Sequence, residues 1–263
     1  MVNKDAYEKL VNEDYKKQHD SVGENTVMFT WFEPCREINL WTYWQGKDSK
    51  NVKIMVVGQD WGNPYHLKNR QTIDNIVQGR NYFYGCSGKM YPTDRTLSRL
   101  FEIIGYKDVI HNRYDDLFFT NFYLKYRADG CKETGGMTRK NMMRDAKNFV
   151  GLVDAINPSV IICLGKLTYE CVIDALKPEG KCRVGKISDY CNLIDNGENY
   201  TDIADIRVFG MVHCGASGIN VNRKKGSKTD KSITGLELML KDWQVVKNYL
   251  ESKNEPLNTC PMD

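Results

Sequence analysis

Four short apolar runs spaced along the chain constrain its fold more than any other feature. They are rich in Val, Ile and Phe, and turn or helix signals separate them. Runs of this length and composition are typical of β-strands that are buried on both faces of a sheet. The runs are VKIMVVG (52–58), DLFFTNF (116–122), SVIICLG (159–165) and IRVFGMV (206–212).

Helical patterns lie between these runs. PTDRTLSRLFEIIG begins with Pro and Thr and ends with Gly, and TRKNMMRDAKNFVGLVDAI places apolar residues every three or four positions. We expect a further helix after Gly165 and another over residues 230–252. Strands that alternate with helices predict an α/β fold with helices on both faces of a parallel sheet. No Pro, Gly or Ser-rich linker divides the chain, so we expect one domain over residues 1–263.

Composition narrows the class of protein. No apolar run approaches the roughly 20 residues of a membrane helix, and the amino-terminal MVNKDAYEKLVNEDYKK lacks the apolar stretch of a signal peptide. We therefore expect a soluble, cytoplasmic protein without a membrane partner. The nine cysteines are irregularly spaced, which favours reduced, mostly buried thiols over a disulfide framework. Because there is no Cys-x-x-Cys pair, we expect no metal site.

Polar side chains follow three of the four predicted strands. The first strand leads into Gln59 and Asp60, the second ends at Asn121 and the fourth leads into His213. The carboxyl ends of parallel strands meet at one edge of a sheet, and ligands bind there. Singly, each residue also fits a structural role: Asp60 as a helix cap, Asn121 as a loop tie and His213 as a core histidine. Together at one edge they predict a functional site.

Motifs of several other α/β enzymes do not fit. GCSGKM and CLGKLT lack the spacing of the Walker loop, and GQDWGN after the first strand is not a dinucleotide fingerprint. GASG is one residue short of a nucleophile elbow. Nucleotide-cofactor and serine-hydrolase functions are therefore disfavoured, and we expect no cofactor.

Five segments occur in a fixed order: VVGQDWGNPYH, NYFYGCSGK, LFFTNFYLKYR, NPSVIICLGKLTYECV and VFGMVHCGASGIN. Together they resemble the uracil-DNA glycosylase superfamily over residues 50–225. The resemblance implies a three-layer α/β/α sandwich with a central four-stranded parallel sheet. It also implies an enzyme that cleaves the bond between a base and its deoxyribose in DNA. Residues 1–45, which hold Trp31, Trp41 and Trp44, lie outside the resemblance and are expected to form an N-terminal helical extension.

The resemblance gives each residue of the predicted site a role. Cleavage of an N-glycosidic bond builds positive charge on the sugar and negative charge on the departing pyrimidine. Asp60 would be the anion near the sugar, as a general base or an electrostatic partner, and His213 would donate to the pyrimidine O2. Asn121 would recognise the pyrimidine edge, since a carboxamide offers a donor and an acceptor. The other base-binding candidates are Gln59, with the backbone N–H near it, Trp61, Gly62 and Phe83, on which the base would stack.

A basic segment follows His213. A base inside a duplex has to be flipped out to reach such a site, and residues 220–231 carry five cations against one anion. Alone, this segment would fit a solvated loop. In the superfamily the loop at this place fills the gap left by the flipped base, so Ile219 or Val221 would be the wedge. The DNA-binding candidates are Ser217, Ile219, Asn220, Arg223, Lys224 and Lys225, and the three cations among them would hold phosphates.

One departure from the superfamily pattern concerns the base. In uracil-specific members a tyrosine two residues past the aspartate excludes substituents at C5, whereas Gly62 stands there in this chain and a tyrosine appears only at Tyr65. We hypothesise that the site accepts a 5-substituted pyrimidine, including the modified bases of phage DNA. Uracil remains the substrate if Trp61 or Asn63 closes the gap.

Two further departures concern metal and orientation. Tyr126 stands where iron–sulfur members have a cysteine, and this difference again predicts no cluster. Cys214 and Gly215 replace the common Pro and Ser, which leaves the orientation of His213 open.

The expected partner is DNA that contains uracil or a modified pyrimidine, in DNA repair or anti-phage defence, and no obligate protein partner is expected. The alternative is a non-catalytic protein of the same fold that binds a modified base or DNA. Asp60 and His213 argue against it, because a protein that only binds has no use for an acid that faces the sugar. A nucleotide-binding protein of metabolism is a more distant alternative.

Overall fold

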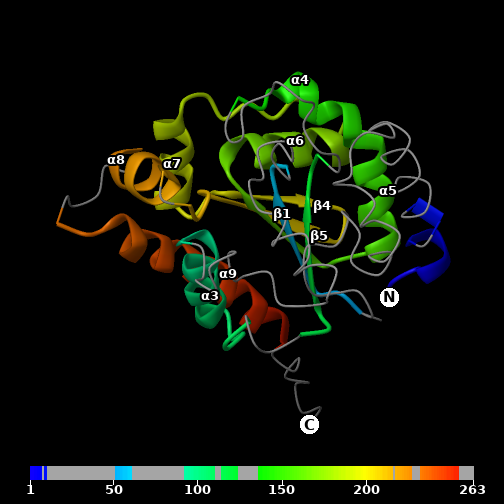
Figure 1. Cartoon of the computed structure of the whole chain (residues 1–263), viewed down its shortest axis with the longest axis horizontal. Coiled ribbons are helices and arrows are strands. Elements are labelled where there is room, and N and C mark those ends of the chain that lie inside the picture. Colours follow the sequence, from blue (N-terminus) through cyan, green and yellow to red (C-terminus); the bar gives the residue numbers. More distant parts are fainter. Residues whose placement is uncertain are drawn as a thin grey trace, which may run out of the picture.

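A five-stranded sheet with helices on both faces forms the centre of the computed structural model (Figure 1). The structure describes residues 1–7, 9–10, 51–60, 92–109, 114–123, 136–215, 217–226 and 232–254. The strands are β1 (Ile54–Gly58), β2 (Leu117–Asn121), β3 (Val160–Leu164), β4 (Tyr200–Ile203) and β5 (Ile206–Met211). The longer helices are α3 (Pro92–Ile103), α5 (Ala146–Ile156), α6 (Lys166–Leu176), α7 (Ile187–Asp195) and α9 (Gly235–Asn254).

The strand order in the sheet is β2-β1-β3-β5-β4. Four of these strands are parallel and match the four predicted apolar runs, whereas β4 pairs antiparallel with β5 at the edge. The α/β class is confirmed, but within the described residues the sheet has five strands rather than the predicted four. β4 was not predicted, because its four residues alternate between exposed and half-buried positions and form no apolar run. Ala204, with a φ of 48°, turns the chain directly into β5.

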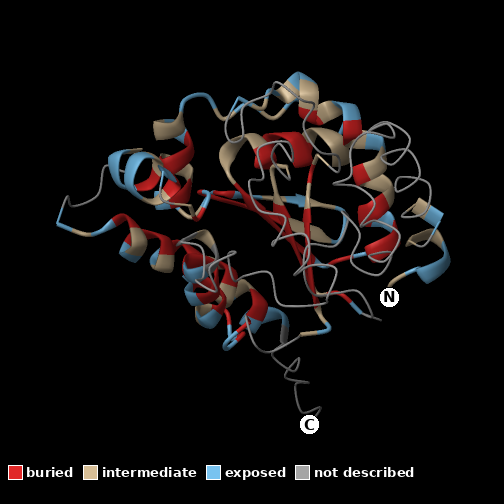
Figure 2. Ribbon diagram, in the orientation of Figure 1, coloured by how far each residue is buried: buried red, intermediate tan, exposed pale blue. Residues whose placement is uncertain are grey.

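Each face of the sheet has its own hydrophobic core. Met55, Val57 and Phe118 face one core, which α5, α6 and α7 cover. Their strand neighbours Ile54 and Phe119 face the other core, which α3 and α9 cover. This alternation buries the strands on both sides, as Figure 2 shows for the central part of the sheet. The expected covering of both sheet faces by helices is thereby confirmed.

Local signals set the helix boundaries. The helix expected in TRKNMMRDAKNFVGLVDAI is divided into α4 (Arg139–Met142), a 3₁₀ turn (Met143–Asp145) and α5. α9 begins later than residue 230 because Thr234 and Glu237 form a capping box. The Thr234 Oγ1 atom accepts from the Glu237 backbone N–H at 3.2 Å, and the Glu237 carboxylate accepts from the Thr234 N–H at 2.7 Å.

The first residues of the chain pack beside α5. Residues 4–7 and 9–10 are helical, the Asn3 N–H donates to the Ala155 carbonyl at 2.7 Å, and Tyr7 meets Phe118 edge to face. The three tryptophans of the expected extension lie outside the described residues. Most cysteines in the described part of the chain are buried, as predicted, and Cys182 is half-buried. No helix there is long and apolar enough to cross a membrane.

Candidate active site

Asn121 and Gly58 meet at the carboxyl ends of β2 and β1. The two residues are partners in the parallel register, and the pairing continues as Phe122 N–H donates to the Gly58 carbonyl at 2.9 Å. The Asn121 carboxamide lies over Gly58, so closely that a Cβ atom on residue 58 would stand 2.2 Å from Oδ1. Only glycine at residue 58 leaves room for the amide in this position.

Gln59 orients Asp60 just beyond β1. The Gln59 side-chain amide donates from Nε2 to the Asp60 Oδ2 at 2.7 Å. Both residues are half-buried, and the Tyr123 N–H fixes the Gln59 carbonyl at 3.1 Å. The carboxylate of Asp60 is therefore held by its neighbour at the same edge of the sheet as Asn121.

Gly165 and His213 follow the next two strands along that edge. Leu164 and Met211 are register partners, and the Gly165 N–H donates to the Met211 carbonyl at 2.7 Å. Gly165 precedes α6 with a φ of 111°, a conformation that favours glycine. A Cβ atom on residue 165 would lie 3.9 Å from the Cβ of His213. The edge therefore has a side-chain-free position directly beside the imidazole.

The backbone of Gly215 fixes the tautomer of His213. The Gly215 N–H donates to the imidazole Nδ1 at 3.0 Å, so the proton of the neutral ring is on Nε2. Loss of solvation lowers the pKa of His213 from its ordinary value, and the negative charge of Asp60 opposes that shift. Part of the residue is open to solvent, so the loss of solvation is incomplete. At neutral pH the imidazole is therefore uncharged and donates from Nε2. The Gly215 N–H orients it, although Cys214 and Gly215 stand where Pro and Ser are common.

Asp60 and His213 lie at the same edge of the sheet and act on each other electrostatically. β3 is the one strand between β1 and β5, and neighbouring strands are about 4.8 Å apart, so the two strand ends are separated by about 10 Å. Gly165 lies between them without a side chain. A carboxylate and a neutral N–H donor thus follow two strands of the same edge, with Gly165 following the strand between them, next to the amino end of α6, whose dipole favours negative charge.

Thr93 also lies beside these residues, although no sequence pattern predicted it as part of the site. It lies at the amino end of α3, and its Oγ1 would be 3.4 Å from a Cβ on Gly215, which would also touch the His213 ring at 3.1 Å. The sequence pattern marked Pro92 and Thr93 only as the beginning of a helix. No local signal places that helix end beside β5, because the contact depends on how α3 packs on the sheet.

The segment after His213 is a π-helical turn (η5, Gly218–Arg223) followed by α8 (Lys224–Gly226). It packs closely on β5, since a Cβ on Gly218 would stand 1.7 Å from the His213 carbonyl oxygen. The two wedge candidates differ: Ile219 is half-buried against the core beneath α3 and α9, whereas Val221 is 52% exposed. The other predicted DNA-binding residues at the surface of this segment are Ser217, Asn220, Lys224 and Lys225.

Arg223 differs from its predicted role as a phosphate contact. It is buried, with 2% of its side chain exposed, and donates from Nε and Nη2 to the two Asp242 carboxylate oxygens at 2.7 Å. Nη2 also donates to Asp195 Oδ1 at 2.7 Å. Burial alone would lower the pKa of Arg223, but the two carboxylates outweigh it and raise the pKa. Arg223 therefore ties the segment to α7 and α9, and it is not available to DNA phosphates.

Several predicted residues lie outside the described part of the chain. They are the base-binding candidates Trp61, Gly62 and Phe83, together with Asn63, Tyr65 and Tyr126. The hypothesis about C5 substituents therefore stays a prediction. In the part of the chain that the structure does describe, no group of three or more His, Cys, Asp and Glu side chains could hold a metal ion.

The site defines a class of protein: an α/β chain with acid, amide and imidazole groups at the carboxyl edge of a largely parallel sheet. Comparison of the chain with protein-family models and with curated proteins found no match. What the site does must therefore be argued from its geometry and from the motifs in the sequence.

Proposed function

We propose that this protein is a DNA glycosylase of the uracil-DNA glycosylase type. It hydrolyses the N-glycosidic bond of a flipped-out pyrimidine, uracil or a 5-substituted base, and leaves an abasic site. The observation that carries this proposal is that Asp60 and His213 lie at one edge of the sheet and act on each other electrostatically, with Gly165 between their strand ends and the His213 proton on Nε2.

The placement of a carboxylate and an N–H donor at one edge of the sheet suits the charge distribution of this reaction. As the bond breaks, the sugar becomes cationic and the pyrimidine O2 becomes anionic. The Asp60 carboxylate faces the sugar, where it orients the attacking water and stabilises the cation, while the His213 Nε2–H donates to O2. A neutral imidazole that is already oriented needs no rearrangement during the reaction, and loss of one such donor costs about 10²–10³ in rate.

Asn121 contributes recognition of the base. Its carboxamide lies over Gly58 at the carboxyl edge of the sheet and offers the base a donor and an acceptor there. Val221, exposed beside Asn220 and the two lysines of α8, is the residue best placed to fill the gap in the duplex.

A substrate panel tests the proposal. Duplexes that carry uracil, a thymine mispair, 5-hydroxymethylcytosine or glucosylated hydroxymethylcytosine are incubated with the protein, and abasic sites are scored. We expect release of at least one of these bases, and release of uracil alone would contradict the hypothesis of an open C5 position.

Variants separate catalysis from binding. Asp60→Asn is expected to abolish formation of abasic sites while DNA binding persists, and His213→Gln to slow the reaction by about 10²–10³. Asp154→Asn, an exposed aspartate on α5, is the matched control and should leave the rate unchanged. If the wild-type protein binds DNA with a modified base but releases none, the chain is a binding protein instead.

A further inference from the structure

A basic strap connects α6 to α7. We use this name for residues 177–186, which carry Lys177, Lys181, Arg183 and Lys186 against the single acid Glu179. All five charged side chains are exposed. A charged loop of this kind is usually only solvated. A binding role would require that the strap is held in a fixed position and lies near the candidate active site.

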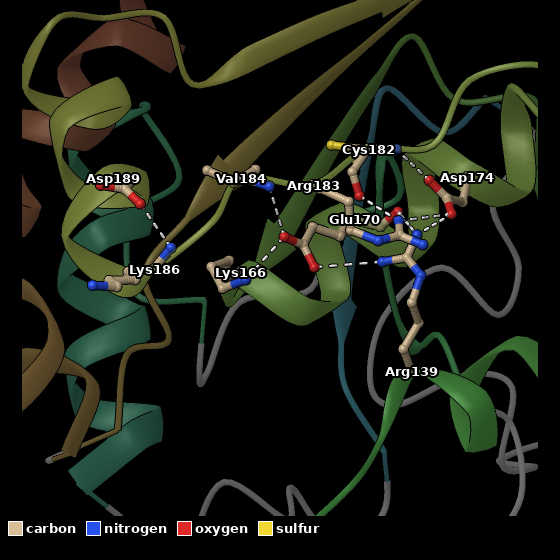
Figure 3. A network of polar contacts seen from close by, with 9 residues as sticks. All are labelled: Arg139, Lys166, Glu170, Asp174, Cys182, Arg183, Val184, Lys186 and Asp189. Carbon is tan, nitrogen blue, oxygen red and sulfur yellow. Dashed lines mark hydrogen bonds and ion pairs between the residues drawn. The ribbon is translucent and has the colours of Figure 1, made fainter.

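The strap is fastened along α6 by two carboxylates one helical turn apart. The Cys182 N–H donates to Asp174 at 2.6 Å and the Val184 N–H donates to Glu170 at 2.9 Å (Figure 3). Cys182 and Val184 are half-buried, whereas Lys181 and Arg183 are exposed. Alternate exposure of this kind is typical of an extended segment that packs one side against a helix. The backbone that carries the exposed cations is therefore fixed in place.

The acids that hold the strap are neutralised inside the network. Glu170, with 6% of its side chain exposed, pairs with Lys166 at 2.9 Å and with Arg139 at 3.4 Å. Asp174 pairs with Arg139 and with Arg183. Burial would raise the pKa of Asp174, but the hydrogen bonds from Arg139, Cys182 and Arg183 outweigh it and keep the pKa low. The two carboxylates that hold the strap are therefore paired within the network, while Lys181 and Lys186 of the strap are exposed.

The carboxyl-terminal end of the strap lies near both the candidate active site and the basic segment after β5. The Val184 N–H donates to Glu170, which also pairs with Lys166, and Lys166 directly follows Gly165, the residue beside His213. Ile187, one residue beyond the strap, lies beside α8, because a Cβ on Gly226 would be 3.7 Å from its carbonyl oxygen.

Lys186, just before α7, is therefore a neighbour of α8 with its exposed Lys224 and Lys225. The Cys191 thiol donates to the Asn222 carbonyl at 3.3 Å. This hydrogen bond also joins α7 to the basic segment after β5. Figure 1 shows α7 and α8 side by side, with the strap arching from α6 to α7. The exposed lysines of α8 are therefore followed, across the first turn of α7, by the exposed Lys186 and Lys181 of the strap.

We propose that the basic strap is a second contact surface for the DNA phosphate backbone, outside the site that holds the base, and that Lys181 and Lys186 make its contacts. This inference rests on the proposed function. Exposed lysines that follow the basic segment on a fixed backbone suit a rigid polyanion, because duplex DNA presents a phosphate charge about every 1.7 Å along its axis. The strap would hold duplex that extends beyond the flipped base.

The salt dependence of DNA binding tests the proposal. The affinity for a duplex with one deoxyuridine is measured by fluorescence anisotropy between about 50 and 200 mM salt. For the Lys181→Gln/Lys186→Gln variant we expect the slope of log K against log salt to become shallower by about 0.9 per lost contact, about 1.8 in all. The single-turnover rate at saturating DNA should not change, because neither lysine belongs to the catalytic machinery.

Two further variants make the outcome decisive. Lys247→Gln/Lys253→Gln removes the same charge from the part of α9 that packs near the beginning of β5, since Arg207 stacks on Tyr249. This control should keep the wild-type slope. Lys224→Gln/Lys225→Gln should lower the slope through the segment already assigned to DNA. If that variant lowers the slope and the strap variant does not, the strap is a solvated surface and the proposed function stands. If wild-type protein does not bind DNA, the proposed function fails as well.

Discussion

Replacing Arg223 by methionine removes the cation from a buried cluster and leaves two carboxylates behind. Asp242 has 5% of its side chain exposed and loses both of its hydrogen bonds from Arg223, while Asp195 is 19% exposed and reaches solvent more easily. Removing one partner of a buried ion pair typically costs about 3–5 kcal/mol. We expect the free energy of unfolding of Arg223→Met to fall by this amount. For a chain of this size the melting temperature would fall by roughly 6–20 °C.

Equilibrium unfolding in urea, followed by circular dichroism, measures the effect. Lys224→Met changes the next residue in the same way at an exposed position and should shift stability by less than about 0.5 kcal/mol. Arg223→Met/Asp242→Leu should regain part of the loss, because it leaves no carboxylate unpaired within the bidentate contact. If Arg223→Met and Lys224→Met unfold at the same midpoint, Arg223 is not a buried anchor, and its sequence-based assignment to DNA phosphates is restored.

Four other changes test the site directly. Titration of the imidazole by NMR should give a pKa for His213 below about 6.5, and Asp60→Asn should lower it further because the carboxylate now raises it. The stability that this lowered pKa contributes is present above about pH 6.5 and is lost as the pH falls towards the folded-state pKa, so His213→Gln should flatten the acid limb of stability against pH. Gly58→Ala, measured by urea unfolding, should cost about 1–3 kcal/mol, because its Cβ would stand 2.2 Å from the Asn121 oxygen. Gly165→Ala should cost about 1–3 kcal/mol at a φ of 111°, and an unchanged midpoint would contradict the described turn into α6.

The sequence was sufficient to locate the parallel strands and the polar residues at their ends. Runs such as VIICL, short, rich in β-branched residues and bounded by Pro158 and Gly165, indicate a buried strand, and the position of His213 follows once β5 is placed. The edge at which Asp60, Asn121 and His213 gather could be predicted because parallel strands all end on the same side. Strand order could not, since it depends on packing between segments far apart in the chain.

Arg223 illustrates what sequence reasoning misses. Its neighbours Asn222, Lys224 and Lys225 make the segment look uniformly exposed, while its partners Asp195 and Asp242 are 28 and 19 positions away. Nothing in a local pattern distinguishes the one buried cation from those beside it. Thr93 was missed for the same reason, because its place beside Gly215 depends on the docking of α3.

The spacing of Asp60 and His213 across β3 has a consequence for how such a protein can change. Backbone hydrogen bonds between β1, β3 and β5 set the separation of the two strand ends, and the loops that connect the strands to the helices take no part in them. Insertions or deletions between the strands can therefore accumulate without moving the acid relative to the imidazole. Changes in the loops between strands can therefore alter which ligand such a protein recognises, while the acid and the imidazole keep their positions.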